Sequence, residues 1–142
     1  MSETLYVVDA SVYASVLVKD EFYERAVNFI REYAGRLATL DLAVLEAANA
    51  LWRHTCLLRR IPLDRYESLA RYVKPLVYGS ARLYASLDLL ESAVRIASDF
   101  SITVYDALYV ALAQKLGCKL ASFDEELKKR LEGFGVRIVE IL

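Results

Sequence analysis

Three acidic residues stand alone in stretches of the chain that carry no other charge: Asp9, Glu46 and Asp106. A fourth, Asp124, follows a short, mostly apolar run and opens a charged segment. Burying one ionised carboxylate without a partner costs several kcal/mol or shifts its pKa. A fold that keeps four such residues is expected to gather them around a positive charge, and a divalent metal ion is the simplest candidate.

The residue types around these acids indicate which metal chemistry to expect. A donor set made of Asp and Glu oxygens suits a hard cation, Mg²⁺ or Mn²⁺. The two cysteines are far apart with no CxxC spacing, and there is one histidine, which argues against a zinc site and against a disulfide framework. A hard-cation site typically receives phosphate oxygens and activates water for in-line attack on a phosphodiester. The hydroxyls of Ser11 and Ser122 are candidates to orient water or a carboxylate.

Each acid also has a purely structural explanation. The three aspartates all stand at the start of an expected helix, where a cap or a favourable dipole contributes up to about 1 kcal/mol. Glu46 is followed by Asn49 and Arg53 at positions i+3 and i+7, an ordinary polar stripe on a helix. Spacing alone therefore leaves the metal site and the structural explanation both open.

The elements that must position these residues alternate along the chain. Strands are predicted at residues 5–8, 37–40, 82–86, 119–123 and 136–142, and helices after Asp9 and at 20–33, 41–60, 62–74, 88–99, 104–116 and 125–132. This alternation predicts an α/β sandwich with a mainly parallel central sheet. Ligands of such sheets bind beyond the carboxyl ends of the strands, so the four acids are expected to converge at one edge.

Composition sets the broader class of protein. A chain of 142 residues fits one domain, residues 1–142. The sequence contains no run of about 18 uncharged apolar residues, the length that a membrane span requires. The N-terminus also lacks the positive charge of a signal peptide. We therefore expect a cytoplasmic protein. The net charge of −1 neither indicates nor excludes nucleic-acid binding. The five glycines form no phosphate-binding loop, which argues against a nucleotide cofactor.

Four segments resemble the successive motifs of PIN-domain proteins, in particular VapC-type toxins of prokaryotic toxin–antitoxin pairs. They are VVDASVYASVLVKDE (7–21), LAVLEAANALWR (42–53), ITVYDALYVALAQKLGCKLASFDEEL (102–127) and the closing GVRIVEIL (135–142). No single motif is highly specific, but four in order make coincidence unlikely. The resemblance covers essentially the whole chain.

The resemblance implies a three-layer α/β/α sandwich and a Mg²⁺- or Mn²⁺-dependent endoribonuclease, the toxin component of its pair. It assigns catalysis and metal binding to Asp9, Glu46, Asp106 and Asp124, with supporting roles for Ser11, Ser122 and Asn49. Ser122 stands where the family more often has Thr. The implied partners are an RNA substrate, a cognate antitoxin and a second copy of the chain in a homodimer, with no membrane involved.

Some residues remain to be placed around this site. Arg53 is the best candidate for a phosphate contact, because it lies on the Glu46 side of its helix. The helices between residues 20 and 74 are expected to meet a second protomer or an antitoxin. Tyr6, Tyr105 and Tyr109 lie in segments expected to be buried, and both cysteines are expected to be buried thiols.

Three other functions compete with this hypothesis. The chief alternative is a PIN-like module that binds RNA or a protein without cutting. A phosphoryl-accepting receiver domain would need adjacent acids after the first strand, which this chain lacks. Catalysis through His54 is disfavoured because no nucleophile motif accompanies it, and a helix-surface or partner-contact histidine is the expected role.

Overall fold

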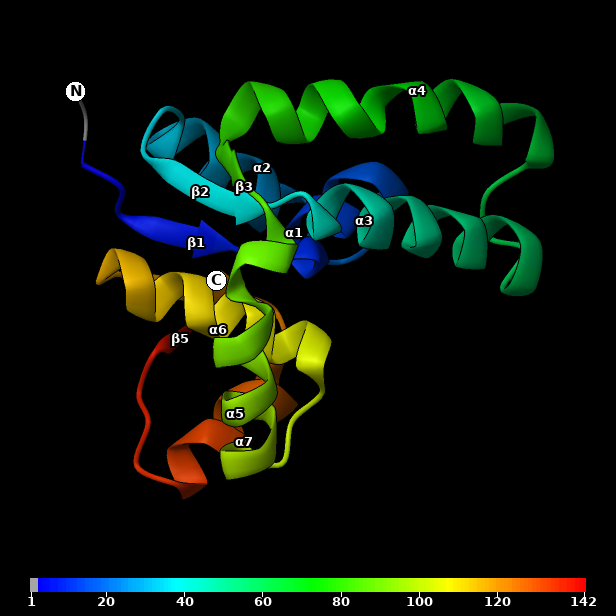
Figure 1. Cartoon of the computed structure of the whole chain (residues 1–142). Coiled ribbons are helices and arrows are strands. Elements are labelled where there is room, and N and C mark those ends of the chain that lie inside the picture. Colours follow the sequence, from blue (N-terminus) through cyan, green and yellow to red (C-terminus); the bar gives the residue numbers. More distant parts are fainter. Residues whose placement is uncertain (1–2) are drawn as a thin grey trace.

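The computed structural model describes residues 3–142, which fold around a five-stranded sheet (Figure 1). The strand order is β3-β2-β1-β4-β5 and all four neighbouring pairs are parallel. The strands are β1 (Tyr6–Val8), β2 (Leu37–Leu40), β3 (Arg82–Tyr84), β4 (Lys119–Ser122) and β5 (Val139–Ile141). The predicted parallel α/β sheet is confirmed.

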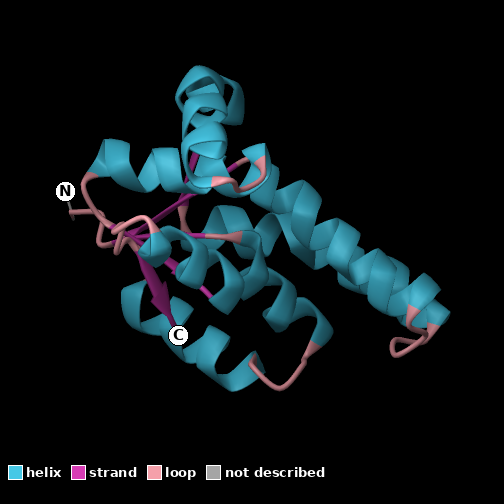
Figure 2. Cartoon of the chain, turned by 90° about the horizontal axis from the view of Figure 1, so that it is seen from below, coloured by secondary structure: helices cyan, strands magenta, loops and turns pink. Residues whose placement is uncertain are grey.

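Helices cover both faces of this sheet. They are α1 (Ala10–Val18), α2 (Tyr23–Tyr33), α3 (Leu42–Trp52), α4 (Leu63–Ser80), α5 (Leu90–Phe100), α6 (Val104–Leu116) and α7 (Glu125–Gly133), with a π-helical turn η1 (Arg53–Leu57) and a 3₁₀ turn η2 (Ser86–Leu89). Figure 1 shows α2, α3 and α4 on one side of the strands and α5 and α6 on the other. The α3–α4 hairpin extends outward from the sheet to the loop at 58–62 (Figure 2). These layers make the α/β/α sandwich.

The strand order reverses between β1 and β4. From β1 the chain builds β2 and β3 on one side, and then crosses to add β4 directly against β1, with Val8 opposite Ala121. In doubly wound sheets, ligands bind in the crevice beyond the carboxyl ends of the strands at such a reversal. Asp9 follows β1 and Asp124 lies just beyond β4, so the topology brings them to this point.

The core explains why α6 can hold a residue at the site firmly. Every residue from Ala107 to Ala113 is buried, which matches the apolar sequence of this helix. On the sheet side, all four residues of β2 are buried. Asp106 therefore lies in the first turn of a helix whose next seven residues are buried in the core.

The helix predicted at 62–74 is longer than expected. We expected it to end before Pro75, but α4 continues to Ser80 with Pro75 inside it. A proline inside a helix removes one backbone hydrogen bond and clashes with the preceding turn. Val73 and Val77, on either side of Pro75, are both buried in the core, and this tertiary packing outweighs the local penalty.

The prediction of one continuous helix at 41–60 was also only partly right. It divides into α3 and the π turn η1, where the Thr55 hydroxyl donates to the Leu51 carbonyl at 2.9 Å. The expectation of two buried thiols was wrong as well, since Cys56 in η1 is exposed and Cys118 is half-buried. His54 is half-buried in the same turn.

Helices long and apolar enough to cross a membrane singly do not occur within residues 3–142. One bent pair, Ser86–Phe100 with Val104–Leu116, meets the length and composition requirement together.

Candidate functional site

Asp9 directly follows β1 at the point where the strand order reverses. Its side chain is buried, with 8% of the residue exposed. The hydroxyl and backbone N–H of Ser11 donate to Oδ1 at 2.5 and 3.0 Å, and the Ser122 hydroxyl donates to Oδ2. The backbone contact makes Asp9 the N-cap of α1. Asp9 is thus a cap, as the structural explanation held, and a carboxylate held in place by two serine hydroxyls.

The two serines join the turns that follow β1 and β4. The Phe123 N–H donates to the Ser11 hydroxyl at 3.0 Å, and the Asp124 N–H donates to the Ser122 hydroxyl at 2.9 Å. Each serine therefore contacts Asp9 on one side and the chain beyond β4 on the other. We call Asp9, Ser11, Ser122 and Asp124 the strand-end cluster.

Asp124 also begins a helix. Its Oδ1 accepts from the Leu127 N–H at 3.0 Å, which caps α7. A carboxylate has about four acceptor positions, so one capping hydrogen bond leaves most of its capacity for a ligand. Capping and ligand binding are compatible roles for Asp124.

Asp106 lies beside this cluster on α6. Its backbone N–H donates to the hydroxyl of Thr103, the N-cap of the helix, at 3.1 Å. Asp106 and Asp124 line the same small hollow of about 230 Å³, together with Thr103 and Arg130. Two of the four predicted carboxylates therefore border one cavity directly.

Glu46 reaches the site from α3. The Tyr109 hydroxyl donates to Glu46 Oε1 at 2.7 Å. Tyr109 belongs to the buried face of α6, with 3% of the residue exposed. The ring is part of the core as predicted, but the hydroxyl also fixes the direction of the Glu46 carboxylate.

Electrostatic coupling connects the four acids. Burial, with a smaller contribution from the charge of Asp106, outweighs the lowering effect of the serine hydrogen bonds and raises the pKa of Asp9 from 3.8 to about 6. Burial and then the charge of Asp106 raise the pKa of Glu46, which Tyr109 opposes. Burial and the charge of Asp124 raise the pKa of Asp106. Asp106 thus interacts with each of the other three carboxylates.

The carboxylates share one edge without already surrounding an ion. Among residues 3–142, no three Asp, Glu, His or Cys side chains lie close enough together to hold a metal as they stand. The donor chemistry nevertheless fits a hard cation, because these side chains supply oxygen atoms and the charges of Asp106 and Asp124 raise the pKa of neighbouring carboxyl groups.

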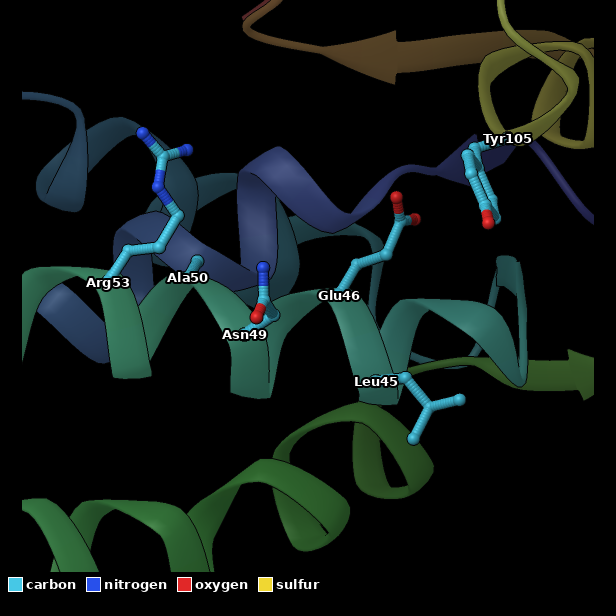
Figure 3. Close-up of a pocket in the computed structure, with 6 residues that line it drawn as sticks. All are labelled: Leu45, Glu46, Asn49, Ala50, Arg53 and Tyr105. Carbon is cyan, nitrogen blue, oxygen red and sulfur yellow. The ribbon is translucent and has the colours of Figure 1, made fainter.

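A groove of about 430 Å³ runs along α3 beside Glu46 (Figure 3). We call it the α3 groove; its lining residues are Leu45, Glu46, Asn49, Ala50, Arg53 and Tyr105. Glu46, Asn49 and Arg53 project from the same side of α3. The prediction that Tyr105 is buried was wrong: the residue is 60% exposed, because it precedes the buried stretch of α6.

The PIN domain family matches residues 6–131. The chain belongs to this family. Among curated PIN relatives, it is 36% identical over 126 residues to Ribonuclease VapC3 of Pyrobaculum aerophilum, covering 87% of this chain and 92% of the relative. It is 32% identical over 129 residues to Exonuclease VapC9 of the same organism, covering 90% and 86%.

A solved structure supports the same fold. The crystal structure of PAE2754 from Pyrobaculum aerophilum superposes with a TM-score of 0.70 and 27% sequence identity, covering 91% of this chain and 87% of that one. The PIN assignment thus agrees with the strand order and layers described above.

Two residues of this PIN domain were not predicted to take part in the site. Tyr109 lies three positions after Asp106, a spacing that places both near one face of a helix, and this was the available signal for its contact with Glu46. Tyr105 had no comparable signal, since its exposure depends on where α6 leaves the core.

Proposed function

We propose that this PIN-domain chain is a Mg²⁺- or Mn²⁺-dependent endoribonuclease and the toxin of a VapBC-type pair. The observation that carries the proposal is that the charge of Asp106 interacts with those of Asp9, Glu46 and Asp124, while Asp9 and Asp124 follow the two strands that meet at the sheet reversal. The ribonuclease and exonuclease names of its VapC relatives support nucleic-acid hydrolysis.

Each residue has a distinct task in this proposal. Asp9, Glu46, Asp106 and Asp124 would hold the ion, which supplies Lewis acidity and water activation when bound. Ser11 and Ser122 hold the Asp9 carboxylate in a fixed orientation through their hydroxyls. Tyr109 does the same for Glu46. Arg53, exposed on the α3 groove, supplies positive charge for an RNA phosphate.

The ion also resolves an electrostatic problem of the fold. Burial and mutual repulsion disfavour the charged forms of Asp9, Glu46 and Asp106, as their raised pKa values express. A divalent cation offsets this repulsion, so its binding should stabilise the folded state by mass action. Mn²⁺ should therefore raise the unfolding temperature, and no shift at several millimolar Mn²⁺ would contradict the proposed site.

The decisive activity test uses purified protein without antitoxin and a broad pool of single-stranded RNA. We expect cleavage with Mg²⁺ or Mn²⁺ and none with EDTA. If the wild-type chain cuts no RNA under these conditions, the alternative gains: a non-catalytic PIN-like module that binds RNA or protein.

The mode of cleavage needs its own substrate, because one relative is named an exonuclease. A circular single-stranded RNA has no ends, so an endonuclease linearises it while an exonuclease leaves it intact. We expect linearisation. If linear RNA is degraded while the circular RNA stays intact, the protein is an exonuclease and not an endonuclease. The proposed metal site would still stand.

The proposed partners fit the exposed apolar side chains of the α3–α4 hairpin. Between residues 52 and 72 these are Trp52, Leu57, Leu58, Leu63 and Tyr72. Clustered exposed apolar groups favour a protein interface, and we propose a homodimer and an antitoxin contact there. If light scattering gives the mass of a monomer at tens of micromolar protein, the proposed homodimer is wrong. We further propose that the chain acts as a single domain, residues 1–142, in the cytoplasm.

A further inference from the structure

We propose that the α3 groove is a subsite for one unstacked base of single-stranded RNA, with the ring of Tyr105 as the stacking platform. The inference rests on the proposed ribonuclease function and specifies how its substrate is held. It arises from the juxtaposition, in one groove, of an exposed aromatic ring, a side-chain amide and a guanidinium next to Glu46 (Figure 3).

The size and composition of the groove suit a base. A volume of about 430 Å³ lies within the usual range for small-molecule sites. Leu45 and Ala50 provide apolar surface, while Asn49 offers both a donor and an acceptor. Unstacked bases are recognised by this combination of aromatic stacking and hydrogen bonds to their edges.

The order of the groups follows the helix. Glu46 and Asn49 lie on α3 at positions i and i+3. Arg53, the first residue of η1, follows at i+7, so it lies about 10 Å along the axis from Glu46. Tyr105 lies near the Glu46 end (Figure 3). A base beside Tyr105 and Asn49 would therefore be next to the carboxylates, with the adjoining backbone directed toward Arg53.

Two tyrosines of α6, Tyr105 and Tyr109, have different environments. Tyr109 is buried and donates to Glu46, whereas Tyr105, one turn earlier, is 60% exposed on the groove. The phenol of Tyr109 is already committed to the protein. The ring of Tyr105 is open to a ligand, and base stacking needs only the ring and not the hydroxyl.

The test measures RNA affinity in an Asp9→Asn background, which prevents cleavage. Fluorescence anisotropy with a labelled single-stranded oligoribonucleotide compares Tyr105, Tyr105→Phe and Tyr105→Ala. We expect Phe to keep the affinity within about twofold, and Ala to weaken it roughly tenfold, the scale of one lost base–aromatic stack. Tyr78→Ala, which removes a tyrosine of α4 that is 60% exposed, as Tyr105 is, but does not line the groove, is the matched control and should change nothing.

Two further variants separate base contacts from phosphate contacts. Arg53→Ala should weaken all sequences alike and reduce the slope of log affinity against log salt by about one. Asn49→Ala should instead change the ranking among oligonucleotides that differ in base composition. Thermal unfolding and size-exclusion chromatography check that each variant keeps its fold and oligomeric state.

These measurements distinguish failure of the base subsite from failure of the proposed ribonuclease function. If wild-type protein cleaves the oligonucleotide but Tyr105→Ala binds it as tightly as the parent, the subsite is overturned and the ribonuclease stands. The same holds if Phe and Ala are equally weak, since stacking would then not be the interaction. If the wild-type chain neither cleaves nor binds RNA, both proposals fall, and the groove belongs to a protein partner.

Discussion

The strand-end cluster and the α3 groove border the same edge of the sheet but are built in opposite ways. In the cluster, the buried hydroxyl of Ser122, the half-buried hydroxyl of Ser11 and backbone N–H groups hold Asp9 and connect two distant turns. In the groove, Asn49, Arg53 and Tyr105 are exposed side chains. The difference indicates that one region fixes charge in place and the other remains open for a substrate.

This contrast predicts two kinds of variant. Changes in the cluster should affect stability as well as activity, because its polar groups are buried or half-buried and satisfy one another's hydrogen bonds. Changes in the groove should affect RNA handling with little effect on unfolding, because exposed side chains contribute little to stability.

The largest effect is expected for Asp9→Asn. Removing this charge should lower metal-dependent RNA cleavage by at least about 100-fold, since a carboxylate at the proposed ion is lost. The fold should persist, because Asn keeps the shape of Asp and can accept a hydrogen bond. Cleavage rates with Mn²⁺, alongside circular dichroism, check this. A folded variant that retains more than a tenth of wild-type activity would remove Asp9 from the site.

The second effect concerns pH. The folded-state pKa of Asp9 is about 6, above its ordinary 3.8, so folding favours the protonated form. The stability from this group is fully present below pH 3.8 and is lost as pH rises through about 6. Without metal, wild-type protein should lose roughly 2–3 kcal/mol over this window relative to Asp9→Asn. Urea unfolding at several pH values in EDTA measures this loss of unfolding free energy. If the unfolding free energy of both proteins depends on pH in the same way, the prediction is wrong.

Ser122→Ala is expected to have the next largest effect. It removes the donor to Asp9 Oδ2 and the acceptor for the Asp124 N–H, which should cost about 2 kcal/mol of unfolding free energy. Ser122→Thr keeps the hydroxyl and should recover most of it. Asn49→Ala in the groove is the contrasting control, with a change below about 0.5 kcal/mol. Equal losses for Ser122→Ala and Asn49→Ala would contradict the contrast.

Tyr109→Phe tests the connection between the two regions. Loss of the hydroxyl frees the Glu46 carboxylate, and we expect roughly tenfold weaker Mn²⁺ binding and cleavage. Tyr13→Phe is a matched control, because Tyr13 is also buried and its hydroxyl hydrogen-bonds Ser80 at 3.0 Å, away from the carboxylates. Both variants should lose similar stability. Only Tyr109→Phe should lose metal affinity in a calorimetric titration, and equal Mn²⁺ binding by both would exclude the positioning role.

The sequence predicted the sheet, and the positions of Asp9 and Asp124 just beyond strands, because both depend on local pattern. Alternating strands and helices are visible in the periodicity of the apolar residues, and parallel connection then brings strand ends to one edge. The span of α4 through Pro75 was not predictable in this way, because Val73 and Val77 hold it by contacts with distant residues. The different fates of Tyr105 and Tyr109 also depend on tertiary packing. The same applies to the pairing of Ser11 and Ser122 around Asp9.

The central claim is that Asp9, Glu46, Asp106 and Asp124 form one metal site. Anomalous diffraction from crystals soaked in Mn²⁺, at a concentration that supports RNA cleavage, tests it most directly. The claim predicts anomalous density bounded by these four carboxylates, and its loss in Asp9→Asn crystals. Active protein whose Mn²⁺ lies elsewhere, or that shows no density at this edge of the sheet, would contradict it.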